Sequence, residues 1–572
     1  MAQSARYRIC RALLPITLMR RMRLVPNALK VASSRIKSHQ VSSTFYEESK
    51  MSVELFNRYR KYLCVCEDID LSLDISRMKF DDNFFASMSA QFSRAFDEMA
   101  KLEAGAIANP DENRRVGHYW LRNPSIAPEA EIRREIEEVR ENVKKFAKRV
   151  HTGDLRAPNG EKYTDLLVIG IGGSALGPQW IASALSTPND AMRVHFLDNT
   201  DPEGIEQTLT AIQHLETLLV VVISKSGSTP ETRNGMLSTD AFLRSHGLDL
   251  AQRAVAITGK DSKLDVMATQ ENWVARFPMW DWVGGRTSEL SAVGLLPAAL
   301  QGIDIDALCQ GAALCDAHTN ARDIAKNPAM LMAAMWFYAT DGKGRRDLVM
   351  LPYKDKLLLF SRYLQQLIME SLGKALDLDG NRVNQGLTVY GNKGSTDQHA
   401  YVQQLRDGID NFFVTFIDVL EYGAPAIEVD DRVTPGDYLH GFLLGTRQAL
   451  AESARESMTI TVRRIDARTI GALIALFERT VGYYASFIHI NAYHQPGVEA
   501  GKKAASKILA IQTRILDALS TTPANAHQIA TTTDLLDDEE TVTRILTYLA
   551  ANARINASSN NPYDFDRTFT RL

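Results

Sequence analysis

The chain has 572 residues, of which 45% are apolar, 23% charged and 8% aromatic. This length and composition suggest about three or four domain-sized units with a large core, and they exclude a disordered protein, a collagen-like repeat and a small disulfide-stapled scaffold. The 65 Lys and Arg residues nearly balance the 69 Asp and Glu residues, which argues against a nucleic-acid binder or a membrane-surface protein.

The first 46 residues differ from the rest of the chain in charge. They carry nine Lys or Arg residues, several serines and no acidic residue, and the first acid is Glu47. Such a composition is typical of an organelle transit peptide. The alternatives are a disordered basic tail, or a true start at Met51. We expect a plastid or another organelle if residues 1–46 are a transit peptide, and the cytoplasm otherwise.

The cysteines and the apolar runs limit the compartment and the cofactors. The five cysteines are few, odd in number and scattered, at positions 10, 64, 66, 309 and 315. We expect reduced thiols rather than a disulfide framework. A zinc site needs about four ligands, and no cluster with that spacing occurs, so we expect no metal. No stretch reaches the roughly 20 apolar residues that span a bilayer, so we expect no membrane segment.

The residues from about 50 to 150 show a helical period. In Met88–Glu103, apolar residues recur at spacings of three and four and form one face. Residues 129–149 are rich in neighbouring Glu and Lys or Arg residues, as in a charged surface helix. We therefore expect this region to be helical.

From about residue 160, short apolar runs alternate with helix-like segments. The first four runs lie at residues 166–169, 194–197, 218–223 and 254–257, and the pattern restarts at 347–351 and 412–416. Such alternation predicts a parallel sheet with both faces covered by helices. Two sheets fit this length better than one very wide sheet. After about residue 510 the pattern is helical again.

The first candidate loop is Gly170–Pro178, which leaves a strand and opens a helix. Its glycines allow main-chain N–H groups to approach an anion at a helix N-terminus. The spacing of Gly170, Gly172 and Ala175 also fits a dinucleotide fingerprint, with Asp198 near the place of the ribose-binding acid. A tight glycine turn without a ligand is the third possibility.

The second candidate loop is Ser224–Thr229, which follows the apolar run 218–223. It gathers four hydroxyl groups and Lys225, and Thr229 and Pro230 fit the N-cap and first position of a helix. These groups and the helix dipole suit a phosphate monoester. The spacing of a nucleotide-triphosphate loop is missing. A capped turn with a solvated lysine is the alternative, but two anion-binding loops on neighbouring strands favour a small phosphorylated ligand.

Five further side chains are candidates for chemistry. Gln366 and Glu370 are four residues apart on an apolar helix expected near residues 356–374, so they share a face. A carboxylate in such surroundings is a candidate general base, although taken alone it fits a surface or ion-paired residue better. Arg286 follows a double glycine, His399 lies in a polar loop, and Lys502 lies in a Gly-rich segment. Each of these three also fits a helix cap, a loop anchor or a solvated charge.

Six sequence blocks together resemble the glucose-6-phosphate isomerase family over about residues 55–515. The blocks are IGIGGSALGP at 169–178, ISKSGSTPETRN at 223–234, WDWVGGRTSELSAVG at 280–294, QQLIMESLGK at 365–374, GSTDQHAYVQQLRDG at 394–408 and HQPGVEAGKK at 494–503. The variants are similar to the plastid and bacterial branch rather than the animal cytosolic branch, which has a threonine-rich phosphate loop. Ser226 and Ser228 stand where relatives often carry Thr or Gly.

The resemblance implies an α/β fold of two sugar-isomerase (SIS) type α/β/α sandwich domains with mainly parallel sheets. It implies a small domain over residues 156–299 and a large domain over 300–510. A helical region over 47–155 would pack on the large domain, and a helical extension would follow over 511–572. It also implies a homodimer with a shared active site, in which the other subunit donates the loop of His399.

The resemblance further implies isomerisation of glucose 6-phosphate and fructose 6-phosphate without a cofactor. The matching substrate-binding residues are Gly173, Ser174, Ser224, Lys225, Ser226, Gly227, Ser228, Thr229, Gln366 and Gln495. The matching catalytic residues are Glu370 as the base, Arg286 as the stabiliser of negative charge, and His399 and Lys502, which we expect to open the sugar ring. The competing functions are a non-catalytic sugar-phosphate sensor and a nicotinamide-dependent oxidoreductase. Mannose 6-phosphate stays open as a further substrate.

Overall fold

The structure is a computed structural model that describes residues 53–572, without the side chains of residues 498–500 and 502. The transit-peptide prediction for residues 1–46 lies outside the described residues, as does Cys10. The chain divides into a unit of residues 1–61, whose described part is a helix over 53–61, and a unit of residues 62–572. The second unit contains both large sheets.

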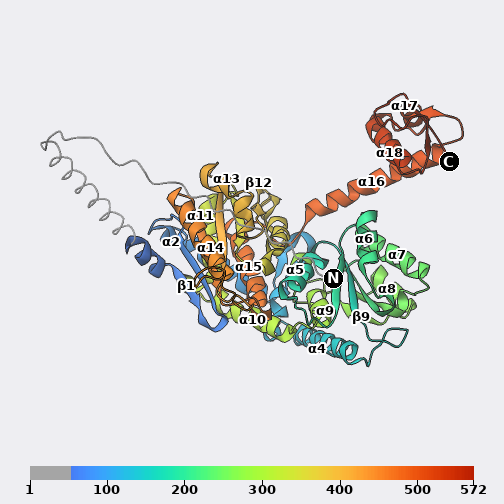
Figure 1. The fold of residues 1–572 in the computed structure, drawn as a ribbon. Coiled ribbons are helices and arrows are strands. Elements are labelled where there is room, and N and C mark those ends of the chain that lie inside the picture. Colours follow the sequence, from blue (N-terminus) through green and yellow to red (C-terminus); the bar gives the residue numbers. More distant parts are fainter. Residues whose placement is uncertain (1–52) are drawn as a thin grey trace, which may run out of the picture. The chain divides into compact units, whose positions relative to one another are not determined.

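The smaller of these sheets has five strands, all parallel, in the order β6-β5-β7-β8-β9 (Figure 1). Four of them confirm the predicted apolar runs, and the fifth, β9, was missed because its residues are half exposed at the sheet edge. The strands are β5 (Asp165–Ile169), β6 (Arg193–Leu197), β7 (Leu218–Ser224), β8 (Ala254–Thr258) and β9 (Ala275–Pro278).

Helices cover both faces of this sheet, because its central strands are apolar on both sides. One face packs on α6 (Pro202–Ala211), α7 (Pro230–Ser245) and α8 (Lys263–Gln270). The other face packs on α4 (Ala130–Thr152), α5 (Leu176–Leu185) and α9 (Ala292–Gln301). The result is the expected α/β/α sandwich.

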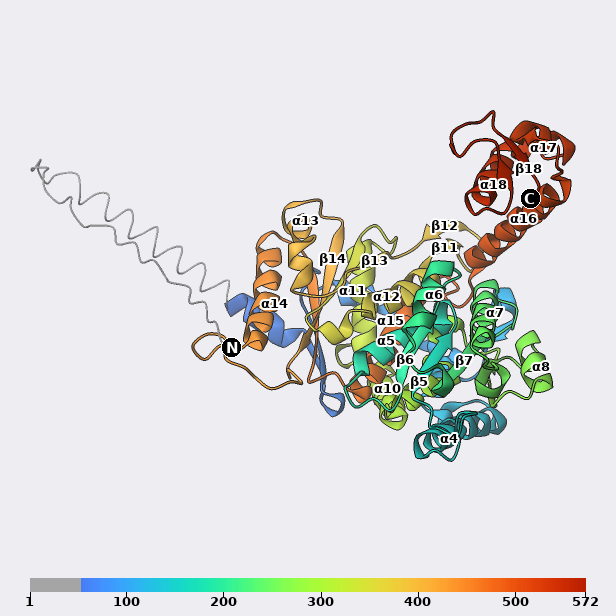
Figure 2. The ribbon, with the colours of Figure 1, turned by 45° about the vertical axis from the view of Figure 1, so that its right-hand side comes forward.

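The larger sheet has six strands in the order β1-β2-β15-β14-β10-β13 (Figure 2). Four of them are parallel, namely β10 (Asp347–Pro352), β13 (Val389–Tyr390), β14 (Phe412–Val419) and β15 (Ser457–Val462). One face packs on α13 (Val402–Asp407) and α14 (Pro435–Glu452), and the other on α11 (Pro328–Thr340) and α15 (Ala467–Phe487). The structure is therefore α/β with two mainly parallel sheets. The domain limits at 156–299 and 300–510 stay predictions.

The predicted helical region over residues 47–155 also contains strands. The helices α3 (Ser89–Glu103) and α4 form as predicted, but β1 (Leu63–Cys66) and β2 (Leu71–Arg77) are strands, and β3 (Ile107–Asn109) and β4 (Arg114–Arg115) form a small hairpin. In β2, apolar residues recur at every second position, and antiparallel pairing with β15 buries them. This pairing with a strand almost 400 residues away is what decides the conformation.

The predicted helical extension over residues 511–572 also contains short strands. The helices α16 (Pro496–Ala518), α17 (Ala526–Thr532) and α18 (Glu539–Ala551) are joined by a three-stranded antiparallel sheet. Its strands are β16 (Ala524–Asn525), β18 (Thr568–Thr570) and β17 (Asn556–Ala557), in that order. The helices and the sheet share a separate core that includes Ile515, Leu546 and Phe569.

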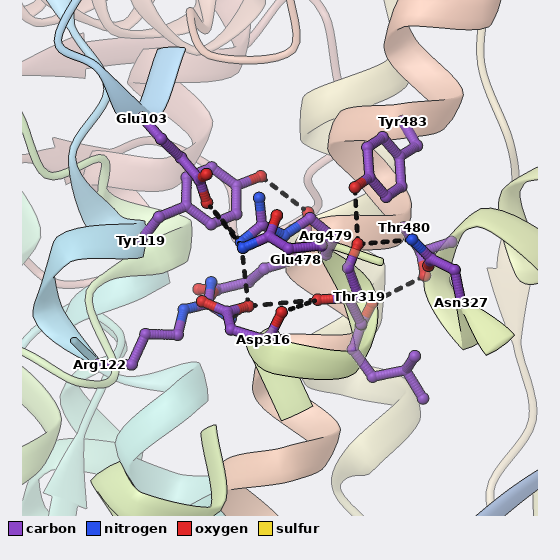
Figure 3. Close-up of polar contacts among 12 residues, drawn as sticks. Glu103, Tyr119, Arg122, Asp316, Thr319, Asn327, Glu478, Arg479, Thr480 and Tyr483 are labelled. Carbon is purple, nitrogen blue, oxygen red and sulfur yellow. Dashed lines mark hydrogen bonds and ion pairs between the residues drawn. The ribbon is translucent and has the colours of Figure 1, made fainter. Parts of the chain in front are cut away.

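A buried cluster of charges lies where α15 packs closely against α10 (Ile305–Thr319) (Figure 3). Arg479 lies 2.6 Å from Glu103 and 3.1 Å from Asp316. Arg122 lies 3.1 Å from the same Asp316 and 2.5 Å from Glu478. Both guanidinium groups also face the ring of Tyr119, at 4.2 and 4.9 Å. Burial raises the pKa of Glu478 to about 8, against the lowering effect of Arg122.

The four described cysteines are free and buried. Within residues 53–572, no helix is both long and apolar enough to cross a bilayer, and no group of three or more His, Cys, Asp or Glu residues is arranged to hold a metal ion.

Candidate active site

The loop Ser224–Thr229 connects β7 to α7 and presents hydroxyl groups at the carboxyl edge of the smaller sheet. Ser224 is buried at the end of β7, whereas Ser226 and Ser228 are exposed. Ser228 donates hydrogen bonds from its N–H and its hydroxyl to Oγ of Ser226, at 3.3 and 3.0 Å. Gly227 has φ +65°, and a Cβ there would lie 2.3 Å from the main-chain nitrogen of Leu264. The turn therefore requires glycine at this position.

The N-terminus of α7 opens onto the same loop without a cap of its own. Thr229 is at the N-cap and Pro230 at the first helical position, as predicted, but the Thr229 side chain does not accept a bond from the helix. Its hydroxyl is instead 3.4 Å from that of Ser224, which donates to it. The N–H groups of the first turn and the positive end of the helix dipole are thus left for an anion.

The side chain of Lys225 turns out of the loop. Its ammonium group donates to the carbonyl oxygens of Asp281 and Val283, at 3.0 and 3.2 Å. Burial lowers the pKa of Lys225. The ammonium therefore ties the hydroxyl-rich loop to the 281–283 segment, and the part of Lys225 that remains in the loop is its main chain.

The glycine-rich loop packs directly onto the segment that carries Arg286. A Cβ on Gly173 would lie 1.9 Å from the carbonyl oxygen of Gly285, so only glycine fits there. A Cβ on Gly172 would lie 3.0 Å from Nε2 of Gln366, which places the Gln366 amide against this loop. Ser174 is half-buried beside it. The two candidate loops and Gln366 thus belong to one neighbourhood.

Glu370 ends an unusual helical turn. The predicted helix near residues 356–374 forms as α12 (Phe360–Leu364) followed by a π-helix over Gln365–Glu370. Such wide turns often occur at functional sites. The Glu370 carboxylate is 16% exposed, and its Oε1 lies 3.2 Å from Nη2 of the buried Arg286. Glu370 is therefore ion-paired, and the same side chain is the candidate general base.

Arg286 lies on the short helix Gly285–Thr287. Its side chain is fixed by four acceptors. Besides Glu370, its guanidinium group donates to the carbonyl oxygens of Ala492 and His494, at 3.0 and 3.2 Å, and to Oε1 of Gln495 at 3.4 Å. Burial lowers the pKa of Arg286, and the Glu370 carboxylate opposes this effect. A guanidinium group stays charged in proteins, so a fixed positive charge lies beside a carboxylate and an amide.

A cavity of about 120 Å³ adjoins Arg286. Its lining includes both Lys225 and Arg286, together with Gly284, Ser371, Glu478 and Gln495. The cavity therefore links the end of the hydroxyl-rich loop to the side of the site that holds the ion pair.

Known proteins are similar to this chain in sequence and in fold. The phosphoglucose isomerase family profile matches residues 74–434 and 445–524. The glucose-6-phosphate isomerase of Nostoc sp. is 57% identical over 505 residues, covering 87% of this chain and 96% of that protein, and the enzyme of Geotalea daltonii is also 57% identical over 505 residues, covering 87% and 95%. A crystal structure of a glucose-6-phosphate isomerase from Chlamydia trachomatis superposes with a TM-score of 0.72 at 26% identity, covering 80% of this chain and 91% of that one. The chain belongs to the phosphoglucose isomerase family.

In this member of the phosphoglucose isomerase family, the carboxylate of Asp198 is bonded within the protein. Its carboxylate accepts from Nε2 of Gln179 at 2.9 Å and lies 3.4 Å from Nη2 of Arg362. The acid on which the dinucleotide interpretation depended therefore already has two partners within the protein.

His399 and Lys502 are not joined to Glu370 and Arg286 by the described contacts. His399 is exposed on the short helix Thr396–His399, in a loop held by the buried Asp397. Asp397 accepts from the main-chain N–H groups of Asn392 and Lys393 and from the hydroxyl of Tyr401. Lys502 lies on α16, and its side chain is outside the described residues.

Sequence reasoning missed one charged residue beside the ion pair. Lys374 is 4% exposed, and its ammonium group donates to the main-chain carbonyl oxygen of Glu370 at 2.6 Å. The available signal was a lysine four residues after a candidate base, at the end of a helix, where basic side chains commonly bond the last carbonyl groups.

We expect Ser226→Ala to raise KM for fructose 6-phosphate with a smaller effect on kcat, because its exposed hydroxyl faces the place proposed for the phosphate. A hydrogen bond to a charged group is worth about 1.5–3 kcal/mol, or roughly a 10- to 100-fold rise in KM. Steady-state kinetics measure it. Ser245→Ala, at the other end of α7, is the control. An unchanged KM in Ser226→Ala would remove this hydroxyl from the phosphate site.

Proposed function

We propose that this chain interconverts glucose 6-phosphate and fructose 6-phosphate as an aldose–ketose isomerase. The ion pair between Arg286 and Glu370, held at 3.2 Å between two glutamine-bearing segments, carries this proposal. A sugar-phosphate sensor needs only the two anion-binding loops. The chain also retains a carboxylate and a fixed guanidinium group together, which supports an enzyme.

The mechanism begins with the phosphate group. The hydroxyls of Ser224, Ser226, Ser228 and Thr229, with the open end of α7, hold it, and Gly173 and Ser174 lie close by. This remote group restricts the sugar so that C1 and C2 stay beside Glu370. Gln366, on the π-helix that ends at Glu370, and Gln495, which accepts a hydrogen bond from Arg286, orient the hydroxyl groups of the open chain.

Glu370 then moves a proton between the two carbons. Its carboxylate takes the proton from C2 of the aldose, the C–H electron pair forms the C1=C2 bond, and the carbonyl electrons move to O1, which gives a cis-enediol or enediolate. Glu370 returns the proton to C1, where the C1=C2 electron pair forms the new C–H bond. The O2–H proton moves to O1, and its bonding pair forms the carbonyl at C2. Arg286 stabilises the negative charge on oxygen, an effect typically worth about 10²–10³ in rate. Before this step, His399 and Lys502 act as the acid–base pair that opens the ring.

The direct test is conversion of fructose 6-phosphate followed by proton NMR in buffer with EDTA and without any nicotinamide. We expect glucose 6-phosphate to accumulate to equilibrium. The same spectra report mannose 6-phosphate as a side product. Binding of fructose 6-phosphate without conversion would favour the sensor, and a fluorescence change with NAD(P)H would favour the oxidoreductase.

The active site is proposed to be shared between two copies of the chain. The exposure of His399 on the short helix Thr396–His399 supports this proposal, because an exposed side chain can reach a second copy of the chain. We expect Glu370→Gln and His399→Ala chains to be nearly inactive alone and to regain activity when refolded together. Each mixed dimer would then hold one site with an intact Glu370 and an intact His399. Failure to complement, with mixed dimers shown by mass, would place both residues in the same chain's site.

The relatives named above are bacterial, and the described residues contain no membrane span. We propose that the chain is of the plastid and bacterial type and that residues 1–46 are a transit peptide. Their basic, acid-free composition supports this proposal. Fusing residues 1–50 to a fluorescent protein tests it, because a diffuse cytoplasmic signal would contradict targeting.

A further inference from the structure

Lys374 closes the turn that presents Glu370. The π-helix ends at Glu370, and Lys374 begins the strand β11 (Lys374–Leu376) four residues later. Its side chain folds back so that the ammonium group bonds the carbonyl oxygen of Glu370 at 2.6 Å. The side chain is almost fully buried, so water does not compete for this bond. No step of the mechanism above uses this lysine.

Charged groups from several elements face Lys374. Arg286 and Glu370 lie on the site side, Asp111 comes from the segment between β3 and β4, and His494 comes from the segment before α16. Burial lowers the pKa of Lys374 to about 7, Arg286 acts in the same direction, and Glu370 and Asp111 oppose it. The ammonium form therefore predominates at mildly acidic pH.

We propose that Lys374 is a positioning residue of the isomerase: its ammonium group holds the main-chain carbonyl at the end of the π-helix and thereby fixes the direction of the Glu370 carboxylate. The inference rests on the proposed function, because it concerns the same base. Charge-assisted hydrogen bonds are roughly twice as strong as neutral ones, so the bond restricts a turn that is otherwise wide. A misplacement of about 1 Å at a reacting group can cost about 10² in rate.

The experiment compares Lys374→Met with Lys374→Arg in the full chain. For Lys374→Met, we expect kcat to fall about 10- to 100-fold with KM for fructose 6-phosphate changed less than about threefold. We also expect the acid limb of its kcat/KM profile to move to higher pH by about one unit, because a cation near the base is lost. Lys374→Arg keeps the charge and a donor at all pH values, so its acid limb stays in place and most of kcat returns.

Lys354→Met is the matched control, because its ammonium group also donates to main-chain carbonyl oxygens, those of Glu421 and Tyr422. It should leave the acid limb unchanged. If Lys374→Met does not fold, Lys374→Gln takes its place, with the same loss and the same shift expected. If the wild type is active and Lys374→Met matches its kcat and its acid limb, only the proposed role of Lys374 is overturned. Equal losses in Lys374→Arg and Lys374→Met, in KM as well as kcat, also overturn it. A wild type that does not isomerise overturns the proposed function.

Discussion

The Glu370→Gln variant is expected to lose about 10³- to 10⁴-fold in kcat, because a positioned general base contributes about that much or slightly less. An amide keeps the shape of the side chain next to Arg286 but cannot accept the C2 proton. Incubation of the variant with glucose 6-phosphate in D₂O should therefore show no deuterium at C2. Binding of the substrate should stay within about tenfold, since the phosphate loops are untouched.

The control for this loss is Glu137→Gln. Glu137 is half exposed on α4 and forms only a surface pair with Arg133 at 3.0 Å, so activity and exchange should match the wild type. Deuterium incorporation at the wild-type rate in Glu370→Gln would show that another group removes the proton. In that case the ion pair with Arg286 would have a structural role.

The largest effect on stability is expected for Arg479→Met. Its guanidinium group is fully buried between Glu103 and Asp316 and over the ring of Tyr119. Removing one partner of a buried ion network leaves uncompensated charge and typically costs about 3–5 kcal/mol in the free energy of unfolding. Urea unfolding followed by fluorescence should show a clear fall in the midpoint.

Arg322→Met provides the comparison for a surface pair. Arg322 lies 2.8 Å from Asp97, with both side chains more than half exposed, so its loss should cost less than about 1 kcal/mol. Equal midpoints for the two variants would mean that the buried cluster in Figure 3 contributes little net stability. Folded Arg479→Met should retain most of its kcat at low temperature, because Arg479 does not touch the ion pair of the site.

Much of the fold could be predicted from continuous apolar runs. The strands β5, β7, β8 and β10 are buried on both faces, so their sequence is unbroken by polar residues and easy to detect. The strands β2 and β9 were missed for the opposite reason. The alternating apolar pattern of β2 is less marked than a continuous apolar run, and β9 is half exposed at the sheet edge.

The site likewise contains features that could be predicted from the sequence and features that could not. Residue types and order predicted the hydroxyl-rich turn, the glycine loop and the helix that carries Glu370. The direction of a side chain could not be predicted from the sequence. Lys225 is an example, because its side chain turns toward Asp281 and Val283. The π-helix was also beyond reach, because a single widened turn depends on packing and hydrogen bonding rather than on residue preference. The roles of His399 and Lys502 stay predictions.

The start of α7 lacks a side-chain cap, and this bears on anion binding. Without a carboxylate, amide or hydroxyl of its own to finish the helix, the protein leaves that end incomplete until an anion arrives. On the proposed function, the phosphoryl group of the substrate would complete this end of the helix, and a sugar without that group would not. Affinity should weaken as the doubly charged phosphoryl group takes up one proton near pH 6, since the singly charged form completes the helix less well.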